Sequence, residues 1–137
     1  AEARARTERD LDATIETMRK LKQRGVRVLP GGDYGFAWAK HGENARDLQY
    51  LVKYAGMTPM EAIVAATKHG GEIMMKGGEL GQVKEGYLAD LLLVDGDPVS
   101  NLAILLDQSK ILAVMKDGVF HKAPAVSTRA GYARSVA

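Results

Sequence analysis

Several residue types and sequence features are missing from this chain, and each absence excludes a class of protein. None of the 137 residues is cysteine, which excludes disulfide bonds, thiolate catalysis and cysteine-ligated zinc sites. No apolar run approaches the roughly 20 residues that a membrane-spanning helix needs, and the sequence does not open with a signal peptide. The net charge is only +2, and Lys and Arg are not clustered, so no nucleic-acid partner is expected. We therefore expect a cytoplasmic protein that acts neither on nucleic acid nor on a membrane.

The composition is that of an ordinary globular protein, with 46% hydrophobic and 26% charged residues. At 137 residues the chain is too short for a complete (β/α)₈ barrel, which needs roughly 200 residues or more. The sequence therefore predicts one domain, or one part of a larger domain.

The beginning of the sequence predicts a helix, a short strand and a glycine-rich loop. Residues 7–10 form a capping-box pattern with Thr7 at the N-cap, and Gly25 is expected to end the helix. Between them, apolar residues recur at steps of four and three: Leu11, Ile15, Met18 and Leu21. Residues 26–29 predict a strand, which Pro30 and two glycines interrupt. In a parallel α/β sheet, the loop after a strand lies at the carboxyl edge, where functional residues gather.

The rest of the sequence predicts two further helices and then a small β unit. One helix is expected from about residue 43 to Gly56, and a second capping box at Thr58 begins the next. Short β-rich runs follow at 91–94, 111–115 and 119–120, and the Asp117-Gly118 pair predicts a hairpin between the last two. The expected organisation is an α/β portion over 1–79, a β segment over 80–122 and a frayed tail over 123–137.

Three motifs occur in order along the chain. The first is GVRVLPGGD at 25–33, which ends in Asp33, and the second is GMTPMEAI at 56–63. The third begins with LGQV at 80–83 and continues through Ala89-Asp90, DGDP at 95–98 and Asp117-Gly118. Together they resemble the C-terminal part of the amidohydrolase superfamily, metal-dependent hydrolases that include imidazolonepropionase and prolidase-like enzymes. The resemblance covers about residues 7–122.

The resemblance implies a distorted (β/α)₈ barrel, of the TIM-barrel type, with a flanking β-sandwich built from both ends of a longer chain. This α/β chain would then hold the last strand–helix unit of the barrel, followed by a small β-sandwich segment. The metal ligands implied are a His-x-His pair after the first strand, a carboxylated Lys or a Glu on the fourth, histidines on the fifth and sixth, and an Asp on the eighth. Only the last has a counterpart here, which is Asp33. We therefore expect zinc, as one or two divalent ions, in a full-length enzyme, and weak or no zinc binding by this chain.

Three residues are candidates for the site. The resemblance implies that Asp33 is both a metal ligand and a catalytic residue, which takes a proton from the nucleophilic water and passes it to the leaving nitrogen. The alternative is a turn aspartate, because Gly-Gly-Asp is common in turns. His41 and Tyr34 are candidates for substrate binding, in a loop that would overhang the barrel mouth. The alternatives are a solvated histidine for His41 and packing of the loop for Tyr34, Phe36 and Trp38.

The function implied by the resemblance is hydrolysis of a C–N bond in a small amide, cyclic amide or dipeptide-like substrate. The chain alone is expected to be inactive, because one carboxylate cannot replace a site of three or more protein ligands. The alternative is a noncatalytic α/β remnant that serves assembly or binding. A homo-oligomer is expected, because a strand at 26–29 without its barrel neighbours has open edges that favour pairing with another copy.

Overall fold

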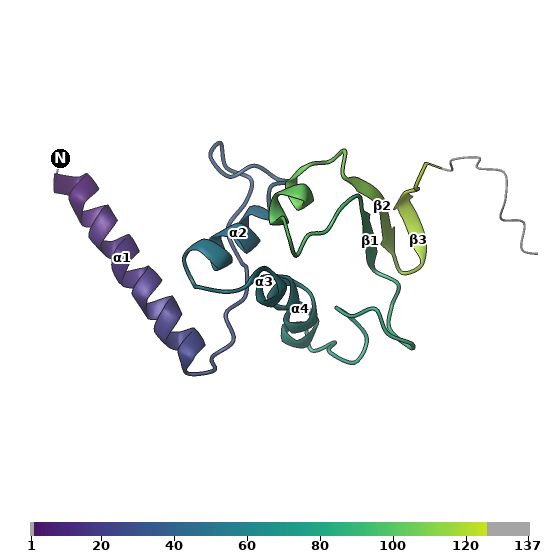
Figure 1. Cartoon of the computed structure of the whole chain (residues 1–137), viewed down its shortest axis with the longest axis horizontal. Helices are drawn as coiled ribbons and strands as arrows, with labels where there is room; N and C mark the ends of the chain where they lie inside the picture. Colours follow the sequence, from purple (N-terminus) through teal and green to yellow (C-terminus); the bar gives the residue numbers. More distant parts are fainter. Residues whose placement is uncertain (1, 126–137) are drawn as a thin grey trace, which may run out of the picture.

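The computed structural model describes residues 2–125 as a mixture of helices and one small antiparallel sheet; most of the predicted tail, residues 126–137, lies outside the described residues. Figure 1 shows the first helix at one end of the molecule, three short helices in the middle and the sheet beyond them. The elements are α1 (Glu2–Gln23), α2 (Arg46–Lys53), α3 (Pro59–Ala66), α4 (Lys68–Ile73), β1 (Leu91–Val94), the 3₁₀ helix η1 (Leu102–Leu106), β2 (Ile111–Lys116) and β3 (Val119–Lys122). None of the helices within residues 2–125 combines the length and the apolar character that crossing a bilayer requires.

Helix α1 ends as predicted but does not begin as predicted. Gly25 follows the helix with a φ of 76°, and its backbone N–H donates to the Lys22 carbonyl, as expected for a helix-ending glycine. Thr7, however, lies inside α1, where its hydroxyl donates to the Ala3 carbonyl at 3.1 Å, so its prediction as the N-cap is wrong. The residues before it alternate alanine with Glu and Arg, which are strong helix formers, and the helix therefore extends past the capping pattern.

The strand predicted at 26–29 is not formed. These residues belong to no helix and no strand, and the sheet described for residues 2–125 contains only β1, β2 and β3. A strand is defined by hydrogen bonds to a neighbouring strand, and no described strand pairs with this segment. The prediction of a strand within this chain is therefore wrong.

The core lies between α2 and α3 and includes a residue of η1. As predicted, α3 begins with a capping box: the Thr58 hydroxyl accepts from the Glu61 N–H at 3.2 Å, and the Glu61 carboxylate accepts from the Thr58 N–H at 2.7 Å. The buried cluster comprises Leu48, Leu51, Ala55, Met57, Ala62, Ala65 and Leu102. Since Leu102 comes from the predicted β segment, the two predicted segments share one core.

The sheet has the order β1–β2–β3, and the hairpin predicted at Asp117-Gly118 is confirmed. Both turn residues have positive φ, 48° and 75°, which is what the favoured two-residue hairpin turn requires. Asp90, just before β1, accepts hydrogen bonds from the Asp117 N–H at 2.7 Å and from the Lys116 ammonium at 2.9 Å. The Asp117 N–H and the Lys116 charge both lower the pKa of Asp90, so the ionised carboxylate joins β1 to the hairpin turn.

We predict that Asp90→Asn destabilises the fold at neutral pH and that this loss depends on pH. Because the pKa of Asp90 is lower in the folded state than in the unfolded state, its charge adds stability above the unfolded pKa of about 4. That contribution is lost as the pH falls through the folded pKa. The free energy of unfolding, measured with urea, should be lower for Asp90→Asn than for wild type at pH 7, and this gap should narrow below pH ~4. Glu85→Gln, at an exposed carboxylate in the loop before β1, is the control and should show no gap; a pH-independent gap for Asp90→Asn would contradict the prediction.

Candidate functional site

The loop between residues 26–29 and α2 carries all three residues singled out from the sequence. Asp33 lies in this loop and is exposed. Its carboxylate makes no hydrogen bond or ion pair with any residue in the described range. The Asp33 carboxylate is therefore open to solvent and is not engaged by the described residues.

The residues on both sides of Asp33 are held by Asp47, in the first turn of α2. The Gly32 backbone N–H donates to Asp47 Oδ2 at 2.9 Å, and the Tyr34 hydroxyl donates to Asp47 Oδ1 at 2.6 Å. Sequence reasoning did not select Asp47. An acidic residue in the first turn of a helix is common, because it stabilises the positive end of the helix dipole, and this signal alone does not indicate a contact with a loop.

Tyr34 is half-buried, and its hydroxyl points toward α2. Burial, together with the hydrogen bond to Asp47, raises the pKa of Tyr34 to about 12. The phenol is therefore protonated at neutral pH and can keep donating its hydrogen bond. This contact favours the packing interpretation of Tyr34, and its role in substrate binding stays a prediction.

His41 lies against the turn that follows Asp33. A Cβ added at Gly35 would be 2.8 Å from His41 Nε2, and the φ of Gly35 is 106°, so a glycine is required at this position. Phe36 and Trp38, in the same turn, stack on each other with their ring centroids 5.2 Å apart, and Trp38 is 79% exposed. The structure thus brings His41 and Asp33 into one loop, while the role of His41 in binding substrate stays a prediction.

The described residues do not form a complete metal centre. Nowhere in residues 2–125 do three His, Cys, Asp or Glu side chains come together as ligands, and His69 and His121 lie apart on α4 and β3. Asp33 fits the role of a single ligand, because its carboxylate is exposed and unpaired with any described residue. A metal at this loop would need further ligands from polypeptide beyond this segment.

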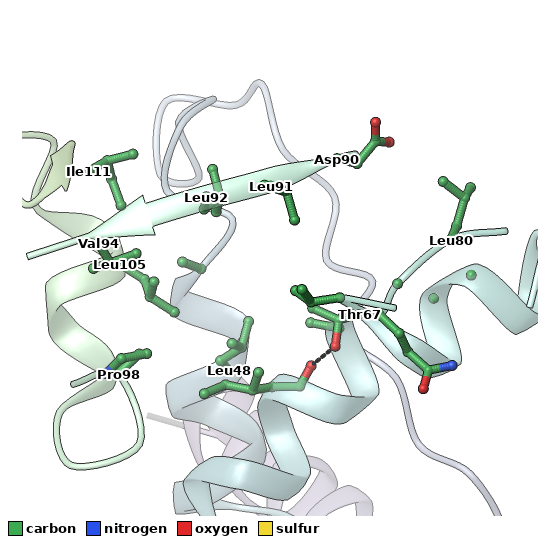
Figure 2. Close-up of a pocket in the computed structure, with 18 of the residues that line it drawn as sticks. Leu48, Thr67, Leu80, Asp90, Leu91, Leu92, Val94, Pro98, Leu105 and Ile111 are labelled. Carbon is green, nitrogen blue, oxygen red and sulfur yellow. Dashed lines mark hydrogen bonds between the residues drawn. The ribbon is translucent and has the colours of Figure 1, made fainter. Parts of the chain in front are cut away.

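Among the cavities that adjoin the helices, one lies beside the candidate loop and one lies against the sheet. A hollow of about 280 Å³ lies beside the loop and is lined by Pro30, Gly31, Gly32, Tyr34, Asn44, Ala45, Asp47, Leu48 and Ala66. A larger groove of about 790 Å³ separates β1 from the helices, with Leu91 and Leu92 on the strand and Leu48 and Thr67 on the helical side (Figure 2). Among the described residues that line this groove, Asp90 is the one ionisable residue, and the hairpin already engages it. The lining that the structure describes is therefore mostly apolar.

Comparison with known proteins establishes the class of protein to which this loop and fold belong. The sequence matches the amidohydrolase family over residues 3–120, and the chain therefore belongs to this family, as the three motifs predicted. Ochratoxinase of Aspergillus niger is 30% identical over 116 residues, which cover 84% of this chain and 23% of ochratoxinase. Imidazolonepropionase of Rubrobacter xylanophilus is 36% identical over 63 residues, which cover 46% of this chain and 15% of that enzyme.

Solved structures show the same relation. The crystal structure of a Xaa-Pro dipeptidase with methionine bound in its active site matches 80% of this chain and 25% of the dipeptidase chain, with a TM-score of 0.70 and 33% identity. The crystal structure of A. niger ochratoxinase matches 85% of this chain and 26% of that chain, with a TM-score of 0.72 and 29% identity. The chain therefore spans about a quarter of the length of these relatives.

Proposed function

We propose that this chain supplies Asp33 and part of the substrate loop to a metal-dependent amidohydrolase that hydrolyses the amide C–N bond of a dipeptide-like small molecule. The observation that carries the proposal is the exposed Asp33 carboxylate, which has no partner within residues 2–125 and lies on a loop held at both flanking residues. Membership of the amidohydrolase family supports it.

The solved structure of a relative supports a dipeptide-like substrate. The dipeptidase, which by its name acts on Xaa-Pro dipeptides, matches 80% of this chain in structure. The match to the dipeptidase includes the structure as well as the sequence, with a TM-score of 0.70. A small dipeptide-like amide is therefore the substrate class that we assign.

The residues of this chain would act as follows. The Asp33 carboxylate would bind the metal as one ligand among several and would move a proton from the attacking water to the leaving nitrogen. The metal, when bound, polarises the scissile carbonyl and makes water more acidic. His41 would donate a hydrogen bond to a substrate oxygen from its place against Gly35. Since one carboxylate does not make a catalytic metal site, we expect this chain alone to bind zinc weakly and to be inactive.

The alternative is a noncatalytic module that serves assembly or binding. It is favoured by the apolar groove of about 790 Å³ and by the lack of a complete ligand set within the described residues. The two functions differ in whether Asp33 contributes to turnover.

A complementation assay tests the proposed function. The Xaa-Pro dipeptidase would be truncated before the quarter of its chain that this chain matches, and this chain would be fused in place of that quarter. We expect hydrolysis of a Xaa-Pro dipeptide that chelation abolishes and added zinc restores, whereas neither part alone should be active. The dipeptidase's own quarter, fused in the same way, is the positive control. A fusion that folds and binds zinc as that control does, yet does not hydrolyse the dipeptide, would support the noncatalytic alternative.

A further inference from the structure

The position of the Asp33 carboxylate must come from its neighbours. The side chain makes no hydrogen bond or ion pair with the described residues, and the segment before it, 26–32, is in no strand. A carboxylate that transfers a proton must lie within hydrogen-bond reach of the reacting atoms, and a misplacement of about 1 Å can reduce a rate by about 10²-fold. Something in the structure therefore has to fix this loop.

We propose that Asp47 is a positioning residue, which holds the Asp33 carboxylate in place by binding the residue on each side of it. Asp47 is half-buried on α2, whose Leu48 and Leu51 are in the core, so the anchor is firmer than the loop. Its two bonds, to the Gly32 N–H and the Tyr34 hydroxyl, are charge-assisted and hence stronger than bonds between neutral groups. The catalytic part of this inference rests on the proposed function.

The hydrogen bond from Gly32 brings its backbone close to the Asp47 carboxylate. A Cβ at this position would lie 3.0 Å from Asp47 Oδ2, 3.1 Å from Oδ1 and 3.2 Å from Tyr34 Cε2. A Cβ at this position would therefore require the carboxylate or the ring to shift by a few tenths of an ångström. The glycine before Asp33 thus serves the contact with Asp47, and not only the turn.

The first test measures the loop itself, in the full chain and without substrate. Backbone ¹⁵N relaxation would be compared in wild type, Asp47→Asn and Gly32→Ala. Asn keeps an oxygen that can accept from the Gly32 N–H, but its amide nitrogen cannot accept from the Tyr34 hydroxyl, and neither contact is charge-assisted any longer. We expect the order parameters of residues 32–34 to fall from about 0.85 toward 0.6 in both variants, while α2 keeps its order. Glu43→Gln is the matched control. Glu43 lies about one turn before Asp47, and its carboxylate pairs with Arg46. Its removal should leave the order of residues 32–34 unchanged.

The second test measures turnover in the fusion enzyme at matched zinc occupancy. We expect Asp47→Asn to lower kcat about 10- to 100-fold with little change in KM, as is typical when a group that orients a ligand is removed. Tyr34→Phe, which leaves the bond to Gly32, should have a smaller effect, and Glu43→Gln should have none. Unchanged loop order in Asp47→Asn, or a loosened loop with normal kcat, would overturn the inference. A fusion inactive with wild-type Asp47 would count against the proposed function alone, since the relaxation data still decide whether Asp47 fixes the loop.

Discussion

Replacing Asp33 with Asn is expected to reduce kcat of the fusion enzyme by about 10²–10⁴-fold, the usual contribution of general acid–base catalysis. The amide cannot accept the proton of the attacking water, and it is a weaker metal ligand than a carboxylate. Folding should be nearly unchanged, because the Asp33 side chain is exposed and makes no hydrogen bond or ion pair with residues in the described part of the chain. The measurement is kcat at matched metal occupancy, with circular dichroism to confirm the fold.

His41→Asn separates the substrate-binding role proposed for His41 from the catalytic role proposed for Asp33. If His41 only binds substrate, the variant should mainly raise KM and leave kcat close to wild type. A near-normal kcat for Asp33→Asn would mean that Asp33 is a turn residue, as the alternative reading of Gly-Gly-Asp holds.

The largest expected loss of stability comes from Gly81→Ala. Gly81 has a φ of 84° and packs against the end of α3: an added Cβ would lie 2.2 Å from the Thr67 carbonyl oxygen and 3.0 Å from Lys68 Cα. These are backbone atoms, which cannot move aside cheaply. Strain from the positive φ costs about 1–2 kcal/mol, and overpacking typically adds about 1–3 kcal/mol. We therefore expect the free energy of unfolding to fall by roughly 2–5 kcal/mol.

Gly86→Ala is the matched control for this variant. Gly86 has almost the same φ, 82°, but nothing lies within 4 Å of an added Cβ. In Gly86→Ala the free energy of unfolding should therefore fall only by the backbone strain, about 1–2 kcal/mol. Urea unfolding followed by circular dichroism measures both variants. Equal losses would show that the close approach to Thr67 is not tight in solution.

Local signals in the sequence predicted much of the fold. The capping box at Thr58 and the Asp117-Gly118 hairpin are confirmed, because each depends on residues within a few positions of one another. The capping pattern at Thr7 failed because the residues before it also favour a helix. The strand at 26–29 failed for a different reason: strand pairing is a contact between distant segments, and none of the strands described in residues 2–125 pairs with this one.

In the candidate site, too, the residues close together in the sequence were predicted and the long-range contact was not. Asp33, Tyr34 and His41 lie within nine residues of sequence, so their place in one loop follows from spacing. Asp47 was not found, because its bonds to Gly32 and Tyr34 join positions 15 and 13 residues apart. Such a contact depends on how the loop folds back onto α2, which no local pattern encodes. The resemblance to amidohydrolases directed attention to Asp33, but only the structure showed what holds its neighbours.

If Asp33 takes part in a metal site, zinc bound to the fusion enzyme should lie against its carboxylate, and anomalous diffraction from crystals of the zinc-loaded fusion enzyme measures this. Data collected on either side of the zinc absorption edge locate the metal without assuming any ligand. We expect an anomalous peak within coordination distance of an Asp33 carboxylate oxygen, and a lower zinc occupancy in Asp33→Asn. A fully occupied metal with the Asp33 carboxylate turned away from it, and the same occupancy in Asp33→Asn, would show that Asp33 is not a metal ligand.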